Sequence, residues 1–250
     1  MSIVKWSKII LFGDSLVQRS FDPNHGLWGT LLANRFQRIC DVIPRGFSGY
    51  TSRAGRTVMR HVFPENISNV EAFIIFFGSN DSGVEESSQN HVPIAEYLDN
   101  LQEMIKYAQK IGVDKDKIIL LTPGAYCDEK FMKWCEELGR TFPKRELEVV
   151  AKYSKECENM SKQLGIDVIN LYEEMMKDED FPKYLLDGVH FSREGSFLVY
   201  NLLMQILERR INVSELNMPY WRDINNIHPA NATPDLCLQK CPSAYFPVEK

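Results

Sequence analysis

Short, continuous apolar runs alternate along this chain with longer stretches in which apolar residues recur at helical spacing. The clearest runs are Ile9–Phe12, Ala72–Phe77, Ile118–Leu121 and Val168–Leu171, with a weaker one at Val42 and Ile43. Runs without polar alternation are typical of strands that are buried on both faces, as in parallel sheets. This alternation constrains the fold more than any other feature of the sequence.

The segments between the apolar runs predict amphipathic helices. The pattern covers Ile94–Ile111, Leu147–Leu164, Leu27–Cys40 and Ser192–Leu207. Gly112 and Gly165 stand where the first two of these helices would end. Ser192 can cap the last one, and Glu194 lies in its first turn, where the helix dipole favours an anion.

Strands that alternate with helices of this length predict β-α-β units and a mostly parallel sheet of about five strands. The expected fold class is α/β, a three-layer α/β/α sandwich formed by a single domain over residues 1–210. Residues 211–250 lose periodicity and become rich in Pro, Asn and Asp. We therefore expect a C-terminal tail that docks on the domain and has a mobile end.

Composition excludes several classes of protein. The 250 residues carry a net charge of −5 without a block of Lys or Arg, so no nucleic-acid partner is expected. No stretch approaches the roughly 20 apolar residues that span a bilayer, and the first apolar run is too short for a secretion signal. The six cysteines are scattered without metal-binding spacing. They fit reduced thiols in a cytoplasmic protein.

The first predicted strand ends at Gly13-Asp14-Ser15-Leu16, which places a hydroxyl at one edge of the sheet. Ligands of open parallel sheets bind outside the carboxyl ends of the strands, where the strand order reverses. Gly13 allows a sharp exit from the strand, and Asp14 can accept hydrogen bonds within the turn. Ser15 is therefore a candidate nucleophile, although an ordinary turn can have the same residues.

A serine hydroxyl is a poor nucleophile unless a base removes its proton, so Ser15 requires a histidine. Of the five histidines, His190 lies in a loop directly before a capped helix. Asp187 precedes it by three residues and Gly188 permits a tight turn, so both side chains can reach one site. We expect His190 to act as the base, with Asp187 orienting the imidazole or acting indirectly through the loop.

Two further strand ends carry groups that can stabilise an oxyanion. Asn80 follows the strongest predicted strand, and its side-chain N–H2 can donate a hydrogen bond. After the second strand, a glycine within residues 46–50 lets the backbone approach a ligand and offer its N–H. Each of these signals alone is compatible with a plain turn, but together they agree in order and in position.

Together these residues resemble the GDSL family of the SGNH hydrolases, which is named for blocks carrying Ser, Gly, Asn and His in this order. Ser15 matches the first block, Asn80 the third, and Asp187 with His190 the Asp-x-x-His of the last. Gly49 best fits the glycine of the second block. The resemblance implies a flavodoxin-like fold, a serine nucleophile, an oxyanion hole formed by Ser15, Gly49 and Asn80, no metal and no cofactor.

The similarity runs to about residue 224 and looks closer to the isoamyl acetate-hydrolysing esterases. It is carried by Leu11–Ser15, Arg45–Tyr50, Phe76–Asp81 and Pro219–Asp223. Pro44 stands where that group usually has Asn, which leaves the choice between Gly46 and Gly49 as oxyanion donor open. The resemblance implies a serine esterase of small, short-acyl carboxylic esters that acts through an acyl-enzyme intermediate, and lipid catabolism is the setting we expect.

Several questions stay open from the sequence. The same catalytic residues can serve an O-acetyl-carbohydrate esterase or a lysophospholipase. A protein of another class, a flavodoxin-like FMN-binding protein, would hold the flavin phosphate in the loop 13–18. The aromatic-rich segment 124–145 is either a wall or lid of the substrate pocket or an extra helix packed on the body. As partners we expect a small-molecule ester and allow for a homodimer.

Overall fold

The computed structural model describes residues 5–84, 90–139, 145–222 and 240–242. A five-stranded sheet with the order β2-β1-β3-β4-β5 forms its centre. The strands are β1 (Ser7–Gly13), β2 (Cys40–Gly46), β3 (Val70–Phe76), β4 (Ile118–Leu121) and β5 (Asp167–Ile169). All neighbours in this sheet pair in parallel. The predicted fold class is confirmed.

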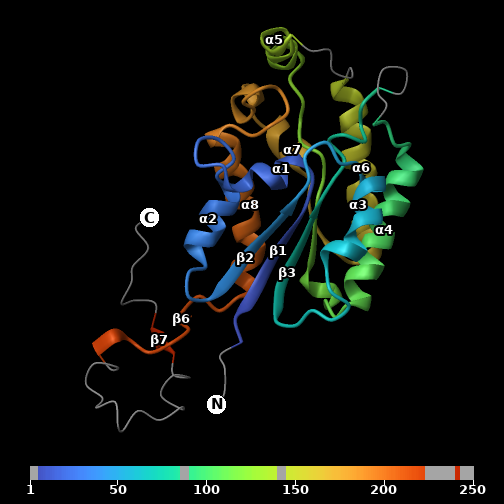
Figure 1. Cartoon of the computed structure of the whole chain (residues 1–250). Coiled ribbons are helices and arrows are strands. Elements are labelled where there is room, and N and C mark those ends of the chain that lie inside the picture. Colours follow the sequence, from blue (N-terminus) through green and yellow to red (C-terminus); the bar gives the residue numbers. More distant parts are fainter. Residues whose placement is uncertain (1–4, 85–89, 140–144, 223–239, 243–250) are drawn as a thin grey trace.

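Helices cover both faces of the sheet (Figure 1). One face carries α1 (Ser15–Gln18), α2 (Trp28–Arg35), α7 (Leu171–Met176) and α8 (Arg193–Arg210). The other face carries α3 (Ser52–Val62), α4 (Ile94–Lys110) and α6 (Leu147–Leu164). Single 3-10 turns lie at Arg19–Phe21, Lys115–Lys117 and Phe181–Tyr184. The remaining helix, α5 (Asp128–Leu138), lies beyond the carboxyl ends of the strands, at the top of Figure 1.

Successive strand residues face opposite helix layers, so the sheet divides the apolar interior into two cores. Ile9 and Leu11 of β1 lie in the core that contains Trp28 of α2. Ile10 and Phe12 lie in the core on the other face of the sheet. All five side chains are buried. Burial on both faces is the physical reason for the continuous apolar runs in the sequence.

The predicted helix over residues 27–40 is wrong at its end. Helix α2 ends at Arg35, and Cys40 already begins β2. Between them, Arg38 has a φ of 61°, which is not a helical conformation. The Asn217 N–H donates to the Arg38 carbonyl at 2.7 Å, so a distant segment fixes this turn. Apolar periodicity along the chain does not record such a contact.

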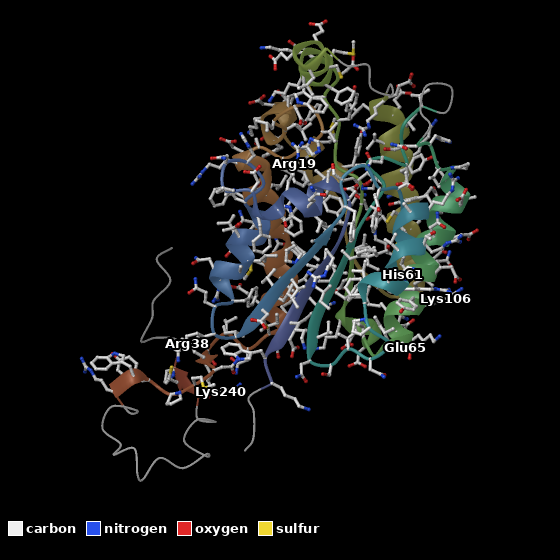
Figure 2. All side chains as sticks on the ribbon, viewed as in Figure 1. Arg19, Arg38, His61, Glu65, Lys106 and Lys240 are labelled. Atoms are coloured by element: carbon white, nitrogen blue, oxygen red, sulfur yellow. The ribbon has the colours of Figure 1, made fainter. Side chains whose placement is uncertain are left out.

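The C-terminal tail contributes a short antiparallel pair that the sequence did not predict, β6 (Glu215–Leu216) with β7 (Cys241–Pro242). Figure 2 places Arg38 beside this pair, far from Arg19. Leu216 and Cys241 are buried in the core that contains Trp28. The division at residue 210 stays a prediction, and the expected mobile end lies outside the described residues.

No helix in the described part of the chain is both long enough and apolar enough to cross a membrane. The cysteines within the described ranges are free thiols: Cys40, Cys127, Cys135, Cys157 and Cys241. Cys237 lies outside those ranges.

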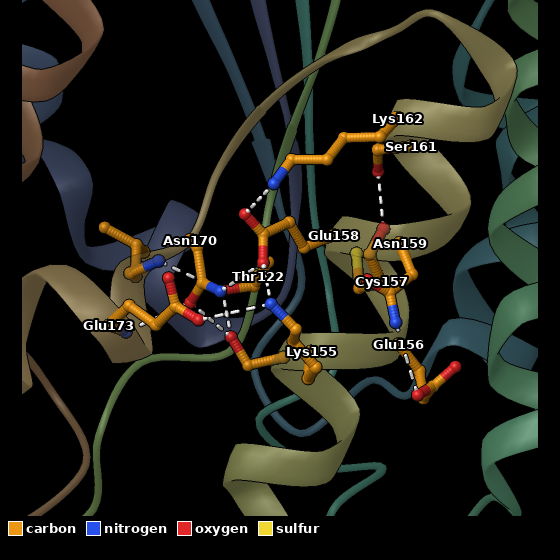
Figure 3. A network of polar contacts seen from close by, with 12 residues as sticks. Thr122, Lys155, Glu156, Cys157, Glu158, Asn159, Ser161, Lys162, Asn170 and Glu173 are labelled. Carbon is orange, nitrogen blue, oxygen red and sulfur yellow. Dashed lines mark hydrogen bonds and ion pairs between the residues drawn. The ribbon is translucent and has the colours of Figure 1, made fainter.

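A buried polar network joins α6 to the ends of β4 and β5 (Figure 3). Ser154 Oγ lies 2.6 Å from Thr122 Oγ1 and 2.7 Å from Asn170 Oδ1. Asn170 Oδ1 also accepts the Glu173 N–H at 3.0 Å and so caps α7. The predicted strand over residues 168–171 therefore ends early, because Asn170 turns the chain from β5 into a helix.

Glu158 is the charged member of this network. Its carboxylate accepts hydrogen bonds from Lys162 Nζ at 2.6 Å, from Lys155 Nζ at 3.1 Å and from Asn170 Nδ2 at 3.1 Å. The hydrogen bond from Lys162, supported by those from the other partners, lowers the pKa of Glu158 to about 2 against the effect of burial. The carboxylate thus stabilises the contact between α6 and the start of α7.

We expect Glu158→Gln to lower the free energy of unfolding at pH 7 by about 1–2 kcal/mol. This figure is discounted because both lysine side chains are more than half exposed. The folded-state pKa lies below the ordinary value of 4.5, so the carboxylate stabilises the fold fully above that pH. The contribution is lost as the pH falls toward 2.

Urea denaturation of both proteins at pH 7 and pH 3 measures this effect. Glu156→Gln, an exposed change on the same helix, is the control and should leave the free energy of unfolding unchanged at both pH values. If the free energy of unfolding of Glu158→Gln lies as far below that of the parent protein at pH 3 as at pH 7, the stabilising role of the carboxylate is contradicted.

Candidate active site

Ser15 is the first residue of α1 and follows β1 after a single residue. Asp14 caps this short helix by accepting the Leu16 N–H at 2.8 Å. Trp28 Nε1 donates to the Leu16 carbonyl at 3.1 Å and so ties α1 to α2. These contacts hold the Ser15 hydroxyl at the carboxyl edge of the sheet, where the sequence predicted it.

The structure brings His190 and Asp187 to Ser15 in series. His190 Nε2 lies 3.0 Å from Ser15 Oγ, and His190 Nδ1 lies 2.6 Å from Asp187 Oδ2. Asp187 Oδ1 accepts the backbone N–H groups of Val189 and His190. Burial raises the pKa of Asp187, but the hydrogen bond and charge of His190 outweigh it and hold this pKa below its ordinary value. Asp187 is therefore an anion that fixes the imidazole.

The loop that carries these two side chains is held against the start of α5. Gly188 has a φ of 88°, and a Cβ at this position would lie 2.3 Å from the Cys127 carbonyl oxygen. The Cys127 N–H donates to the Gly188 carbonyl at 3.0 Å, and the Leu186 N–H donates to the His190 carbonyl at 2.7 Å. Glycine is required for this turn, and the turn brings both side chains to one site.

The two glycines after β2 have different surroundings. A Cβ on Gly46 would lie 2.0 Å from Gln18 N, so this glycine permits the close packing of β2 against α1. Gly49 has a φ of 81°, has open space around it, and lines the same cavity as Ser15. The structure therefore places Gly49, rather than Gly46, at the cavity that Ser15 lines.

Asn80 also reaches the cavity, where both ends of its amide have partners. Its Nδ2 donates to the Tyr50 carbonyl at 2.9 Å, and Arg145 Nη2 donates to its Oδ1 at 3.2 Å. Arg145 lies in the segment between α5 and α6. Sequence reasoning gave Arg145 no role, because a single arginine there belongs to no motif.

A cavity of about 330 Å³ lies over Ser15. Helix α5 supplies an apolar wall of Phe131, Trp134 and Leu138, and the Trp134 ring meets the His190 ring edge-on with centroids 6.3 Å apart. Within the segment 124–145, α5 is thus an extra helix that also forms a wall of the cavity. Polar side chains, among them Ser48 and Asn80, line other parts of the cavity.

Arg19 is a second arginine at this cavity that sequence reasoning missed. Its Nη1 lies 3.6 Å from Asp187 Oδ2, and its side chain is 38% exposed. Figure 2 shows Arg19 near the strand ends, far from Glu65 and Lys106. Those two residues line a larger hollow of 570 Å³ between α3 and α4, and the residues that line it include no Ser, Cys or His.

A hydroxyl, an imidazole and a carboxylate in series, facing a cavity, are arranged for nucleophilic catalysis. Among the described residues, no group of three or more His, Cys, Asp or Glu side chains is placed to hold a metal ion. A three-layer parallel α/β fold with this arrangement at its strand ends is typical of a serine hydrolase.

The chain belongs to the GDSL-like lipase/acylhydrolase family, whose model matches residues 11–196. The isoamyl acetate-hydrolyzing esterase 1 homolog of Mus musculus is 36% identical over 232 residues, which cover 91% of this chain and 92% of that protein. The Homo sapiens homolog is 35% identical over 240 residues, covering 95% and 94%. A lipase/acylhydrolase from Enterococcus faecalis has the same fold, with a TM-score of 0.61 at 22% identity over 82% of this chain and 97% of that one.

Family membership confirms the resemblance and the prediction of a carboxylic ester hydrolase with a serine nucleophile. It also decides between the two classes that the sequence left open. The protein belongs to the esterases and acylhydrolases, the first of these two classes.

Asp14 is a buried acid directly beside the candidate nucleophile. Its side chain is fully buried, and Oδ2 has no hydrogen-bond partner among the described residues. Burial raises the pKa of Asp14 to about 7, although the Leu16 N–H lowers it, and the charge of Asp81 raises it further. Because Asp14 is fully buried, its ionised form destabilises the fold.

We expect Asp14→Asn to gain stability relative to the parent protein as the pH rises from 5 to 8, by about 2 kcal/mol over this interval. The folded-state pKa of about 7 lies above the ordinary value of 3.8, so the parent loses stability through this range while the amide cannot ionise. Free energies of unfolding from urea titrations measure the difference. Asp41→Asn, on the exposed surface, should keep the parental pH dependence, and the same dependence in Asp14→Asn contradicts the assignment.

Proposed function

We propose that this protein hydrolyses small carboxylic esters with a short acyl group, such as acetates, through an acyl-enzyme on Ser15. The observation that carries the proposal is the 3.0 Å contact between His190 Nε2 and Ser15 Oγ, continued by the 2.6 Å contact to Asp187. This geometry supports general-base activation of a hydroxyl that faces the cavity.

In the proposed first half-reaction, Ser15 Oγ attacks the ester carbonyl carbon while its proton moves to His190 Nε2. The carbonyl oxygen becomes the oxyanion of a tetrahedral intermediate, and Asp187 stabilises the imidazolium through Nδ1. Collapse of the intermediate breaks the bond to the alcohol oxygen, which takes the proton from His190 and leaves. The acyl group remains on Ser15.

In the second half-reaction, water occupies the place of the alcohol. His190 Nε2 takes one proton from this water as its oxygen attacks the acyl carbonyl carbon. The second tetrahedral intermediate then expels Ser15 Oγ, which takes the proton back, and the carboxylic acid leaves. The proposed cycle uses no metal and no organic cofactor.

We assign the oxyanion to the backbone N–H groups of Ser15 and Gly49 and to the side chain of Asn80. Ser15 is the first residue of α1, so its N–H has no partner within the helix. Gly49 lines the cavity beside it. The Asn80 amide has two N–H bonds, and one donation to Tyr50 leaves the other for the oxyanion.

The size and walls of the cavity support a small ester. A volume of 330 Å³ lies near the lower end of the range for small-molecule sites. Phe131 and Trp134 offer an apolar surface to an alkyl chain. The mouse and human relatives are named for isoamyl acetate, an ester that joins a short acyl group to a branched alkyl alcohol.

An O-acetylated carbohydrate is the second candidate substrate, because part of the cavity lining is polar. Ser48, Asn80 and Arg19 offer hydrogen-bonding groups to the hydroxyls of such an alcohol. A lysophospholipid would share the catalytic residues, but its long acyl chain fits a cavity of this size poorly. We propose that the reaction takes place in the cytoplasm and belongs to the breakdown of small lipid-derived esters. The homodimer stays a prediction.

We expect Ser15→Ala and His190→Ala to lower kcat for p-nitrophenyl acetate by at least about 10⁴-fold, because the nucleophile or its base is lost. Steady-state kinetics measure the loss, and a fluorophosphonate probe reports whether Ser15 is labelled. Ser48→Ala, at another serine of the same cavity, is the matched control for labelling and should still react with the probe. Hydrolysis or labelling that survives in Ser15→Ala contradicts the proposal.

We expect kcat/KM for p-nitrophenyl esters to fall by at least about tenfold from acetate to octanoate, because the cavity limits the acyl chain. Trp134→Ala removes part of the α5 wall and should raise the relative turnover of octanoate. Isoamyl acetate, acetylated xylose and lysophosphatidylcholine in the same panel separate the candidate alcohols. A preference of the parent protein for octanoate contradicts the short-acyl assignment.

A further inference from the structure

Arg145 lies in the active-site cavity, although it belongs to none of the four motif blocks. An isolated backbone bridge pairs it with Gly83, in the loop that follows β3. Its guanidinium carbon lies 5.3 Å from the centre of the Phe131 ring on α5. The backbone of Arg145 is therefore held by the loop that carries Asn80, and its side chain lies against the apolar wall of the cavity.

The guanidinium of Arg145 is a partly buried charge at the wall of the cavity. Burial lowers the pKa of Arg145, and its Nε has no hydrogen-bond partner within the described part of the chain. None of the ion pairs among the described residues includes it. Burying a cation without such a partner costs stability. A buried charge of this kind beside a nucleophile points to a functional role.

The hydrogen bond that the guanidinium does make is with Asn80. Arg145 Nη2 donates to Asn80 Oδ1 at 3.2 Å, while Asn80 Nδ2 donates to the Tyr50 carbonyl at 2.9 Å. A guanidinium can only donate and a carbonyl can only accept, so these two partners define which end of the amide lies on which side. The amide plane is thereby fixed, and with it the direction of the second N–H.

The same contact affects the strength of that N–H as a donor. A cation on the amide oxygen draws electron density from the nitrogen, and hydrogen bonds in such a chain strengthen one another. Asn80 therefore offers a better donor to a developing oxyanion than an amide whose oxygen faces water.

We propose that Arg145 is a positioning residue of the oxyanion hole, which holds the Asn80 amide so that its second N–H is aimed at the oxyanion. This inference rests on the proposed function, in which Asn80 donates to that oxygen. The rival role for a buried arginine is to bind a carboxylate or phosphate on the substrate. The positioning role requires the Asn80 side chain, because it acts through that amide. The anion-binding role requires a negatively charged substrate and does not depend on Asn80.

A double-mutant cycle with Asn80 tests the proposal. We expect Arg145→Ala to lower kcat for p-nitrophenyl acetate by about 10- to 100-fold with KM changed less than about twofold. Asn80→Ala should cost more, about 10²–10³-fold, because it removes the donor itself. In the Asn80→Ala background, Arg145→Ala should change kcat by less than about twofold, since the group through which it acts is absent. If the kcat losses of the two single variants multiply in the double variant, the proposal is overturned.

Two further variants separate positioning from a general structural role. Arg145→Lys keeps a charged donor and should recover most of the lost kcat. Arg210, in the last turn of α8, is the matched control, because its Nη1 is also buried and has no hydrogen-bond partner in the described ranges. Arg210→Ala should lower the free energy of unfolding and leave kcat unchanged. Arg145→Met keeps an aliphatic stem over Phe131 and replaces Arg145→Ala in the cycle if that variant does not fold.

The remaining outcomes also decide the question. A loss confined to an ester that carries a carboxylate, such as 4-acetoxybenzoate, with p-nitrophenyl acetate unaffected, overturns positioning and assigns Arg145 to substrate binding. Failure of the proposed function is visible separately, because the parent protein then hydrolyses none of these esters or Ser15→Ala retains the activity.

Discussion

The parallel pairing of β1 with β2 and β3 is the constraint on which the site depends. Gly13, at the end of β1, pairs with Gly46 of β2 and with Phe76 of β3, so three segments leave the sheet at one edge. Ser15 and Asn80 follow two of these ends closely and therefore become neighbours. The apolar cores on the two faces fix this pairing, because a shift by one residue would move every strand side chain to the wrong face.

Buried ionisable groups have fewer hydrogen-bond and ion-pair partners beside Ser15 than in the network around Glu158. Glu158 has three hydrogen-bond donors, and its contribution to stability is favourable. Beside Ser15, Asp14 has a raised pKa, and within the described residues its Oδ2 has no hydrogen-bond partner and Arg145 has no ion pair. Such costs are tolerated where a structure is shaped by chemistry rather than by stability alone. Asp187 is the exception, since His190 and two backbone N–H groups satisfy it.

Helix α5 contacts three separate parts of the candidate site. Its start accommodates the turn at Gly188, and its Trp134 meets the ring of His190. Its Phe131 lies against the guanidinium of Arg145. The same helix therefore shapes the cavity, supports the loop of His190 and contacts the arginine that donates to Asn80.

The sequence by itself determined the fold class and brought Ser15, Asp187 and His190 forward as candidates. Both follow from local rules, since burial on two faces produces continuous apolar runs and a glycine turn brings residues three apart to one site. Only the tertiary structure placed Gly49 rather than Gly46 at the cavity and brought Arg145 to Asn80. These contacts join segments that are distant in the chain, and neither periodicity nor spacing records which distant segments pack together.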